Sequence, residues 1–130
     1  RTLAFGKQSK DYMKMVDFIR PVIEELNAMF VPGASTREIE KWYISRLAEG
    51  GYPDFGSVPL GHGIGTGHLP PTFYRDDDYI LEENVMIVPC AHIYDFKTNC
   101  GVFALEYVVC VKPGKAEVFT KYPLDLITIG

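Results

Sequence analysis

The chain has 130 residues, a formal net charge of −4 and 47% hydrophobic residues, which is the size and composition of one globular domain. No basic stripe is visible and no apolar run is long enough to cross a bilayer, so we expect neither nucleic acid nor a membrane as a partner. No secretory signal is present, and the three cysteines have no framework spacing, which predicts reduced thiols in a cytoplasmic protein. The chain begins at Arg1 rather than at methionine, which leaves room for a leader or a longer upstream region.

The first part of the sequence has the apolar periodicity of a helix. Residues 1–6 are typical of the end of a strand, and Ser9 can then cap a helix over about residues 10–31. Pro21 lies inside this helix. It predicts a kink or a break near Arg20, because the proline ring removes a hydrogen-bond donor and crowds the preceding turn.

A second helix and a sheet follow. The capping box Ser35–Glu38 starts a helix over about residues 36–50, which stops at a pair of glycines. From Tyr52 onward β-branched residues, aromatic residues, glycine and proline replace the helix formers, which predicts a mostly antiparallel sheet over about residues 58–130. The expected strands are Val85–Tyr94, Val102–Lys112, Ala116–Thr120 and Leu126–Ile129. This order predicts one α+β domain over residues 1–130.

One expected strand contains a charge that its pattern does not explain. The stretch VFALEYVVCV, residues 102–111, is apolar on both faces, which predicts a central strand covered on both sides. Glu106 is the only charged residue in it. A buried carboxylate is costly unless it is paired, hydrogen-bonded or bound to a metal ion. The pattern therefore leaves three explanations open: a lysine or arginine partner, a position at the solvated rim, or a metal ion.

The preceding strand carries Cys90 and His92 on one face. If the hairpin between the two strands is symmetric about Thr98, Cys90 lies directly opposite Glu106 and Ala104 faces His92. The proline before Cys90 implies a bulge or an edge that would shift this register. Such a Cys-x-His pair is more often a buried thiol and a core histidine than a metal site.

The segment LGHGIGTGHLPP, residues 60–71, places two histidines on a glycine-rich backbone. Glycine lets the backbone approach neighbouring elements closely or adopt a positive φ. From a loop of this kind, His62 and His68 can be aimed at one point as ligands or as an acid–base pair. The alternative is a tight turn without a chemical role.

The order of these motifs resembles a known family. Six motifs follow one another along the chain. They are a Gly-His-Gly-Ile-Gly segment, a histidine ahead of Pro-Pro, LEENVMIVPCAHIY, a Gly-Val strand with a glutamate, VKPGKAEVFT and YPLDLITI. This order is similar to the C-terminal half of the pita-bread fold of methionine aminopeptidases, prolidases, aminopeptidase P and creatinase, and closest to the aminopeptidase P and prolidase branch. The segments RTLAFGK and VPGASTREIEKWYISRLAEGGY fit it as well. The resemblance implies half of a pita-bread fold, with two helices packed on a curved, mostly antiparallel sheet.

The resemblance also implies roles for individual residues. In the metal-dependent members, two aspartates, one histidine and two glutamates hold two divalent ions. By position His62 resembles the ligand histidine, Glu106 the glutamate that bridges both ions, and His68 the catalytic histidine that contacts the substrate. Two cations about 3.5–4 Å apart activate a bridging water and polarise the scissile carbonyl. The implied metal is manganese, cobalt or zinc, and the implied partner is a peptide substrate.

The chain departs from the family pattern at several of these positions. Cys90-Ala91-His92 stands where the family has Glu-Pro-Gly, so a soft ligand that suits zinc replaces a carboxylate at Cys90. Leu69 replaces the usual acidic residue, and the spacing between the two histidines is one residue short. No aspartate pair precedes Arg1, and we expect Asp76–Asp78 to form a solvated turn rather than a ligand set. The metal site is therefore expected to be absent or incomplete in this chain.

These observations predict a metallohydrolase domain similar to Xaa-Pro aminopeptidase and prolidase, truncated and inactive as this chain. The alternatives are a non-catalytic pita-bread scaffold that binds a peptide or a protein partner, and a metal-free C–N hydrolase similar to creatinase. A lone half of the fold would expose the sheet edge and face that the other half covers, and exposed edges pair. We therefore expect a homodimer, with His62, Cys90 and Glu106 near its interface.

Overall fold

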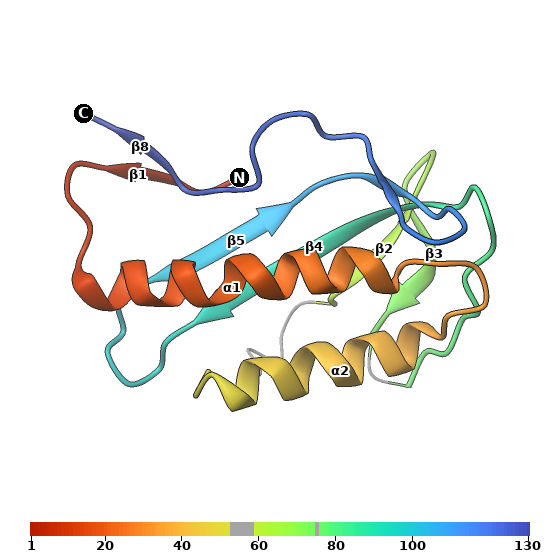
Figure 1. Cartoon of the computed structure of the whole chain (residues 1–130), viewed down its shortest axis with the longest axis horizontal. Coiled ribbons are helices and arrows are strands. Elements are labelled where there is room, and N and C mark those ends of the chain that lie inside the picture. Colours follow the sequence, from red (N-terminus) through yellow and green to blue (C-terminus); the bar gives the residue numbers. More distant parts are fainter. Residues whose placement is uncertain (53–58, 75) are drawn as a thin grey trace.

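The computed structural model describes residues 1–52, 59–74 and 76–130. Within these residues two helices lie on one side of a six-stranded sheet, and a separate two-stranded sheet joins the two ends of the chain (Figure 1). The helices are α1, Lys10–Met29, and α2, Thr36–Glu49. The strands are β1 Leu3–Phe5, β2 Gly61–Ile64, β3 His68–Phe73, β4 Met86–Tyr94, β5 Val102–Glu106, β6 Val109–Cys110, β7 Glu117–Val118 and β8 Ile127–Ile129.

Helix α1 begins at the predicted residue and ends at Met29, two residues before the predicted end. The hydroxyl of Ser9 caps it by accepting a hydrogen bond from the backbone N–H of Tyr12. The helix continues through Pro21 to Met29, so it has no break near Arg20. Ile19, two residues before the proline, and Val22, directly after it, are completely buried in the core. This packing offsets the hydrogen bond that the proline removes, because tertiary contacts supply most of the stability of a helix in a protein.

Helix α2 begins and ends close to the predicted residues. The hydroxyl of Ser35 accepts a hydrogen bond from the N–H of Glu38, as the capping box requires. The helix ends at Glu49, and a Cβ on the following Gly50 would lie 2.3 Å from the ring of Phe18. Glycine at this position therefore allows the end of α2 to approach α1.

The six-stranded sheet has the order β3-β2-β4-β6-β7, with β5 paired to β4, and all of these pairings are antiparallel. The register of β4 and β5 is the predicted one, since Cys90 lies opposite Glu106 and His92 lies opposite Ala104. The strand expected over residues 102–112 is interrupted after Glu106 and returns as the short β6. Outside this sheet, β1 and β8 pair in parallel.

Strands β2 and β3 were expected as a loop, and the structure corrects this expectation. They form an antiparallel hairpin whose register shifts between His62 and Gly63. A Cβ on Gly63 would lie 2.4 Å from the carbonyl oxygen of Pro70, so the close approach of the two backbones requires glycine. The expected start of the sheet at about residue 58 lies outside the described residues.

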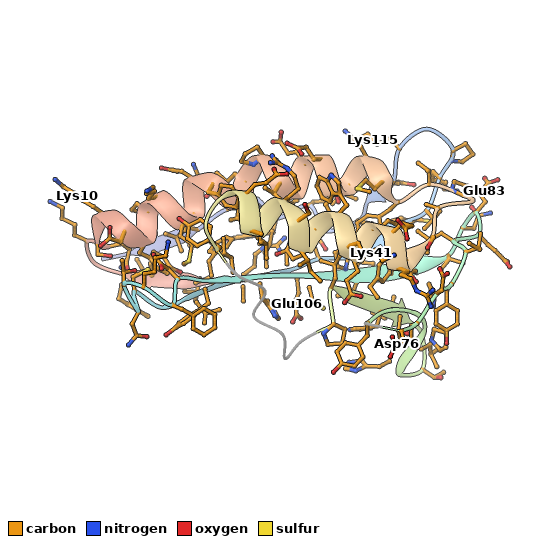
Figure 2. The ribbon with its side chains drawn as sticks, turned by 90° about the horizontal axis from the view of Figure 1, so that it is seen from below. Lys10, Lys41, Asp76, Glu83, Glu106 and Lys115 are labelled. Atoms are coloured by element: carbon orange, nitrogen blue, oxygen red, sulfur yellow. The ribbon has the colours of Figure 1, made fainter. Side chains whose placement is uncertain are left out.

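The two faces of β5 differ sharply in exposure. Phe103 and Leu105 are completely buried beneath the helices, whereas Val102 is 40% exposed and the Glu106 side chain is 56% exposed. Figure 2 shows Glu106 on the side of the sheet away from both helices. The expectation that this strand is covered on both sides is therefore wrong, because the helices cover one face only.

The N-terminal residues run along β5. The hydroxyl of Thr2 donates to the carbonyl of Ala104 and accepts from its N–H, both at 2.9 Å. The guanidinium of Arg1 donates to the backbone carbonyl of Glu106 at 2.5 Å. The three cysteines are free. Neither described helix combines the length and the apolar character needed to cross a membrane.

Candidate active site on the sheet face without helices

The predicted site residues lie on one face of the sheet. Residues directly opposite each other in paired strands share a face, and alternate residues along one strand do so too. His62 of β2 lies opposite Val88 of β4, and Cys90 of β4 lies opposite Glu106 of β5. Strands β2 and β5 flank β4 on its two edges. The positions that point away from the helices are termed the helix-free face; its residues are His62, Val88, Cys90, His92, Ala104 and Glu106.

Glu106 faces an imidazole. Its Oε1 lies 3.6 Å from Nε2 of His92, whose side chain is 16% exposed. Arg1 contacts the backbone carbonyl of Glu106, and among the described residues no lysine or arginine is paired with its carboxylate. The carboxylate is more than half exposed, as expected for the solvated position that the sequence left open.

The surroundings of His92 favour its neutral form. Burial lowers the pKa of this imidazole, and the nearby Glu106 carboxylate only partly opposes that effect. The backbone carbonyl of His92 accepts a hydrogen bond from the hydroxyl of Tyr43 at 3.0 Å. Because Tyr43 belongs to α2, this bond ties the strand position of His92 to the helix layer behind it.

Cys90 is a buried thiol. Its Sγ lies 3.6 Å from the carbonyl oxygen of Val88, to which the thiol can donate. Burial raises the pKa of Cys90 to about 12, and the negative charge of Glu106 adds to the increase. The thiolate is the form that attacks electrophiles and binds metal ions. Cys90 is therefore held as the neutral thiol, which is a poor nucleophile.

The structure brings His62 and His68 together from the two strands of the β2–β3 hairpin. Their ring centroids are 4.1 Å apart, with an angle of 32° between the ring planes. Nδ1 of His62 lies 2.8 Å from the carbonyl oxygen of Gly63, which can only accept, so Nδ1 carries the proton. Nε2 of His62 is then the nitrogen that can accept a proton or bind a metal ion.

The metal that the family implies requires donors that converge. His62 can offer Nε2 and Glu106 can offer a carboxylate. However, they lie on opposite edges of β4, His62 beside Val88 and Glu106 beside Cys90, so their backbones are not adjacent. Among residues 1–52, 59–74 and 76–130, no group of three or more His, Cys, Asp or Glu side chains is placed to hold one ion. One imidazole, one carboxylate and a neutral thiol do not fit a two-cation centre, which needs several carboxylate oxygens.

The aspartates of the loop after β3 have structural partners. Asp77 accepts a hydrogen bond from the hydroxyl of Thr72, and Asp78 accepts one from the hydroxyl of Ser35 at 2.6 Å. Asp78 also lies 3.6 Å from the guanidinium of Arg37. The contacts of Asp78 hold the loop against the start of α2, whereas Asp77 contacts Thr72 of β3, which lies opposite His62.

Sequence reasoning missed the contact between His92 and Glu106, although a signal for it was present. In the predicted register His92 faces Ala104, and Glu106 is two residues further along the same strand. Such diagonal neighbours are about 7–8 Å apart at Cα, within reach of long side chains. In the predicted register, Glu106 is therefore the diagonal neighbour of His92, which is the signal for their contact.

Comparison with known proteins places the chain in a family. Residues 1–113 match the family described as Metallopeptidase family M24. The chain belongs to this family. A relative, the Xaa-Pro dipeptidase of Pyrococcus horikoshii, is 25% identical over 128 residues, which are 98% of this chain and 36% of the relative. The chain thus spans about a third of the length of such relatives.

Solved structures of an Xaa-Pro dipeptidase and an X-Pro aminopeptidase have the same fold. The Xaa-Pro dipeptidase from Bacillus anthracis superimposes with a TM-score of 0.88 at 25% identity, over 99% of this chain and 36% of that protein. The X-Pro aminopeptidase from Thermotoga maritima gives a TM-score of 0.87 at 23% identity, over 98% and 36% respectively, which indicates the fold alone. The comparisons confirm the resemblance to the prolidase and aminopeptidase branch of the pita-bread family, and the α+β fold of two helices on a mostly antiparallel sheet.

Proposed function

We propose that the chain is part of a hydrolase domain similar to Xaa-Pro dipeptidases, and that its helix-free face lines the peptide-binding site. In this proposal His62 and Glu106 are metal-ligand positions, Cys90 occupies the position of a third ligand, and His68 is the catalytic histidine beside the substrate. We further propose that the 130 residues alone do not hydrolyse peptides.

One observation carries the proposal. The side chains at the positions of the family's histidine and glutamate ligands share one face of adjoining strands, beside a stacked second histidine. Helices cover the opposite face, so this is the face that a substrate can reach (Figure 2).

The test is hydrolysis of an Xaa-Pro dipeptide and of a peptide with an N-terminal Xaa-Pro sequence, with added Mn²⁺ or Zn²⁺. We expect the chain to show the same rate as its Glu106→Gln variant. If the coding sequence continues upstream of Arg1, the longer polypeptide is assayed as well, with Glu106→Gln and His62→Ala as its controls. Turnover by the 130 residues that Glu106→Gln abolishes would contradict the proposed inactivity. Peptides that shift no resonance of His62 or His68 in NMR titrations would contradict the peptide-binding face.

A second candidate is a non-catalytic scaffold of the same fold. The protonated, buried thiol at position 90 favours it, because this position then contributes neither charge nor a metal ligand. The two candidates differ in one result: the scaffold binds the Xaa-Pro peptide, and no length of the polypeptide cleaves it. Hydrolysis that persists in the presence of a chelator would instead support a metal-free C–N hydrolase.

We also propose that two copies of the chain cover each other's helix-free face. Two apolar side chains on this side of the sheet are exposed, Ile64 at 43% and Val102 at 40%. Light scattering after size exclusion should give the mass of a dimer, and Ile64→Lys should shift it toward the monomer. Phe119→Lys, which changes an apolar residue of similar exposure beyond β7, is the matched control. A monomer at all concentrations would rule out the dimer.

A further inference from the structure

We infer that the His92 side chain fills the place beside Glu106 that a divalent cation takes in the family, so that this face as it stands does not hold the family's pair of metal ions. The inference rests on the proposed location of the site. It does not depend on whether the chain or a longer polypeptide has hydrolytic activity.

Each side chain at a predicted ligand position is engaged by another group of the chain. Oε1 of Glu106 is directed at Nε2 of His92, 3.6 Å away. The thiol of Cys90 is buried beside the carbonyl oxygen of Val88. The ring of His62 stacks on a second imidazole and is fixed through Nδ1. An ion beside Glu106 would have to displace His92 from the carboxylate, whereas the contact of His62 through Nδ1 leaves its Nε2 available.

His92 is placed there by the framework and not by a flexible loop. It lies within β4, opposite Ala104, whose small side chain leaves room for the imidazole to reach the diagonal Glu106. The hydrogen bond from Tyr43 holds its backbone from the other side of the sheet. The resemblance places a glycine at this position, and glycine has no side chain with which to occupy the space.

The test restores a carboxylate at position 90 and then removes the imidazole. Cys90→Glu is compared with Cys90→Glu/His92→Ala, and Mn²⁺ binding is measured by titration calorimetry. We expect the double variant to bind Mn²⁺ at least about tenfold more tightly, because groups that surround metal ligands typically change metal affinity by about 10- to 100-fold. Cys90→Glu/His92→Phe is the matched control. Its ring still fills the space without offering a nitrogen, so we expect no gain. Glu106→Gln added to the double variant should remove the gain.

The outcomes separate the inference from its competitors. If removal of His92 weakens Mn²⁺ or Zn²⁺ binding, His92 is itself a ligand and the inference is wrong. An equal affinity with and without His92 also overturns it, because another feature then excludes the ion. None of these results depends on peptide hydrolysis, so a failure of the proposed function and a failure of this inference are distinguishable.

NMR of the unaltered chain and of the single Glu106→Gln variant covers the case in which the variants at positions 90 and 92 do not fold, which circular dichroism would reveal. The sequence contains three histidines, so the ring-proton region of the NMR spectrum is simple. We expect Glu106→Gln to shift the His92 ring signals more than those of His62 or His68. We also expect one equivalent of Mn²⁺ to leave the His92 signals sharp. Paramagnetic broadening of His92 and His62 at one equivalent would overturn the inference.

Discussion

The two faces of the β4–β5 hairpin share a backbone but differ in the exposure and polarity of their side chains. On the helix side Ala91, Phe103 and Leu105 have no exposed surface. On the helix-free side, the same strands carry Glu106, more than half exposed, and His92 beside it. Alternate residues of the same strands therefore differ in role: one set packs in the core, and the other set includes the polar side chains of the candidate site. Substitutions on the two sides should therefore have very different effects on folding.

The largest expected effect is loss of an aromatic side chain from the helix side. Phe103→Ala should lower the free energy of unfolding by about 3–5 kcal/mol, because it leaves a cavity in a completely buried position. Val102→Ala, its neighbour on the helix-free side, should cost about 1 kcal/mol or less. Urea denaturation followed by circular dichroism measures both values. Equal losses would show that the two faces do not differ in the way the burial indicates.

The next effect concerns the hairpin that presents the two stacked histidines. Gly63→Ala places a Cβ 2.4 Å from the carbonyl oxygen of Pro70, and backbone cannot move aside as a flexible side chain can. We expect a loss of about 1–3 kcal/mol and weaker nuclear Overhauser effects between the rings of His62 and His68. Gly67→Ala is the control, since a Cβ there meets no atom within 4 Å. An unchanged hairpin in Gly63→Ala would contradict the close approach.

Polar contacts on the two sides should also differ in strength. The hydroxyl of Tyr107 donates to Oδ1 of Asn27 at 2.8 Å, and both residues are buried. Tyr107→Phe strands this buried amide oxygen and should cost about 1–2 kcal/mol. Glu106→Gln on the helix-free side should change the free energy of unfolding by about 0.5 kcal/mol or less, because solvent reaches the carboxylate. The same urea titrations test both, and a larger loss for Glu106→Gln would reverse the comparison.

The smallest effect is a pH dependence that comes from His92. Because its folded pKa is lowered, the unfolded chain binds a proton that the folded chain does not as the pH falls below about 6.5. The free energy of unfolding should therefore decrease with acidification until the folded pKa is reached. His92→Ala should remove this part of the loss between pH 7 and pH 5, as measured by urea denaturation at each pH. Glu106→Gln should enlarge the loss, since the carboxylate favours the protonated imidazole.

The sequence predicted the elements whose local pattern agrees with their final environment. Both helices carry capping residues and an apolar stripe, and the register of β4 with β5 follows from the position of the hairpin loop. Strands β2 and β3 could not be predicted from propensity, because glycine and proline are poor strand formers and the pairing with β4 decides their structure. The solvated position of Glu106 was left open but not decided, because apolar neighbours on both faces of the strand predict burial, while the described helices cover one face only.

The pairing of Cys90 with Glu106 and of His92 with Ala104 has an evolutionary consequence. Every second codon in these strands specifies a side chain outside the main hydrophobic cluster, so point mutations at those codons can exchange reactive groups at a smaller cost to folding. An insertion or deletion inside either strand would instead transfer the reactive groups into the hydrocarbon interior. Descendants of this chain can therefore acquire new chemistry by substitution within β4 and β5, and changes of length are tolerated only in the turn that joins them.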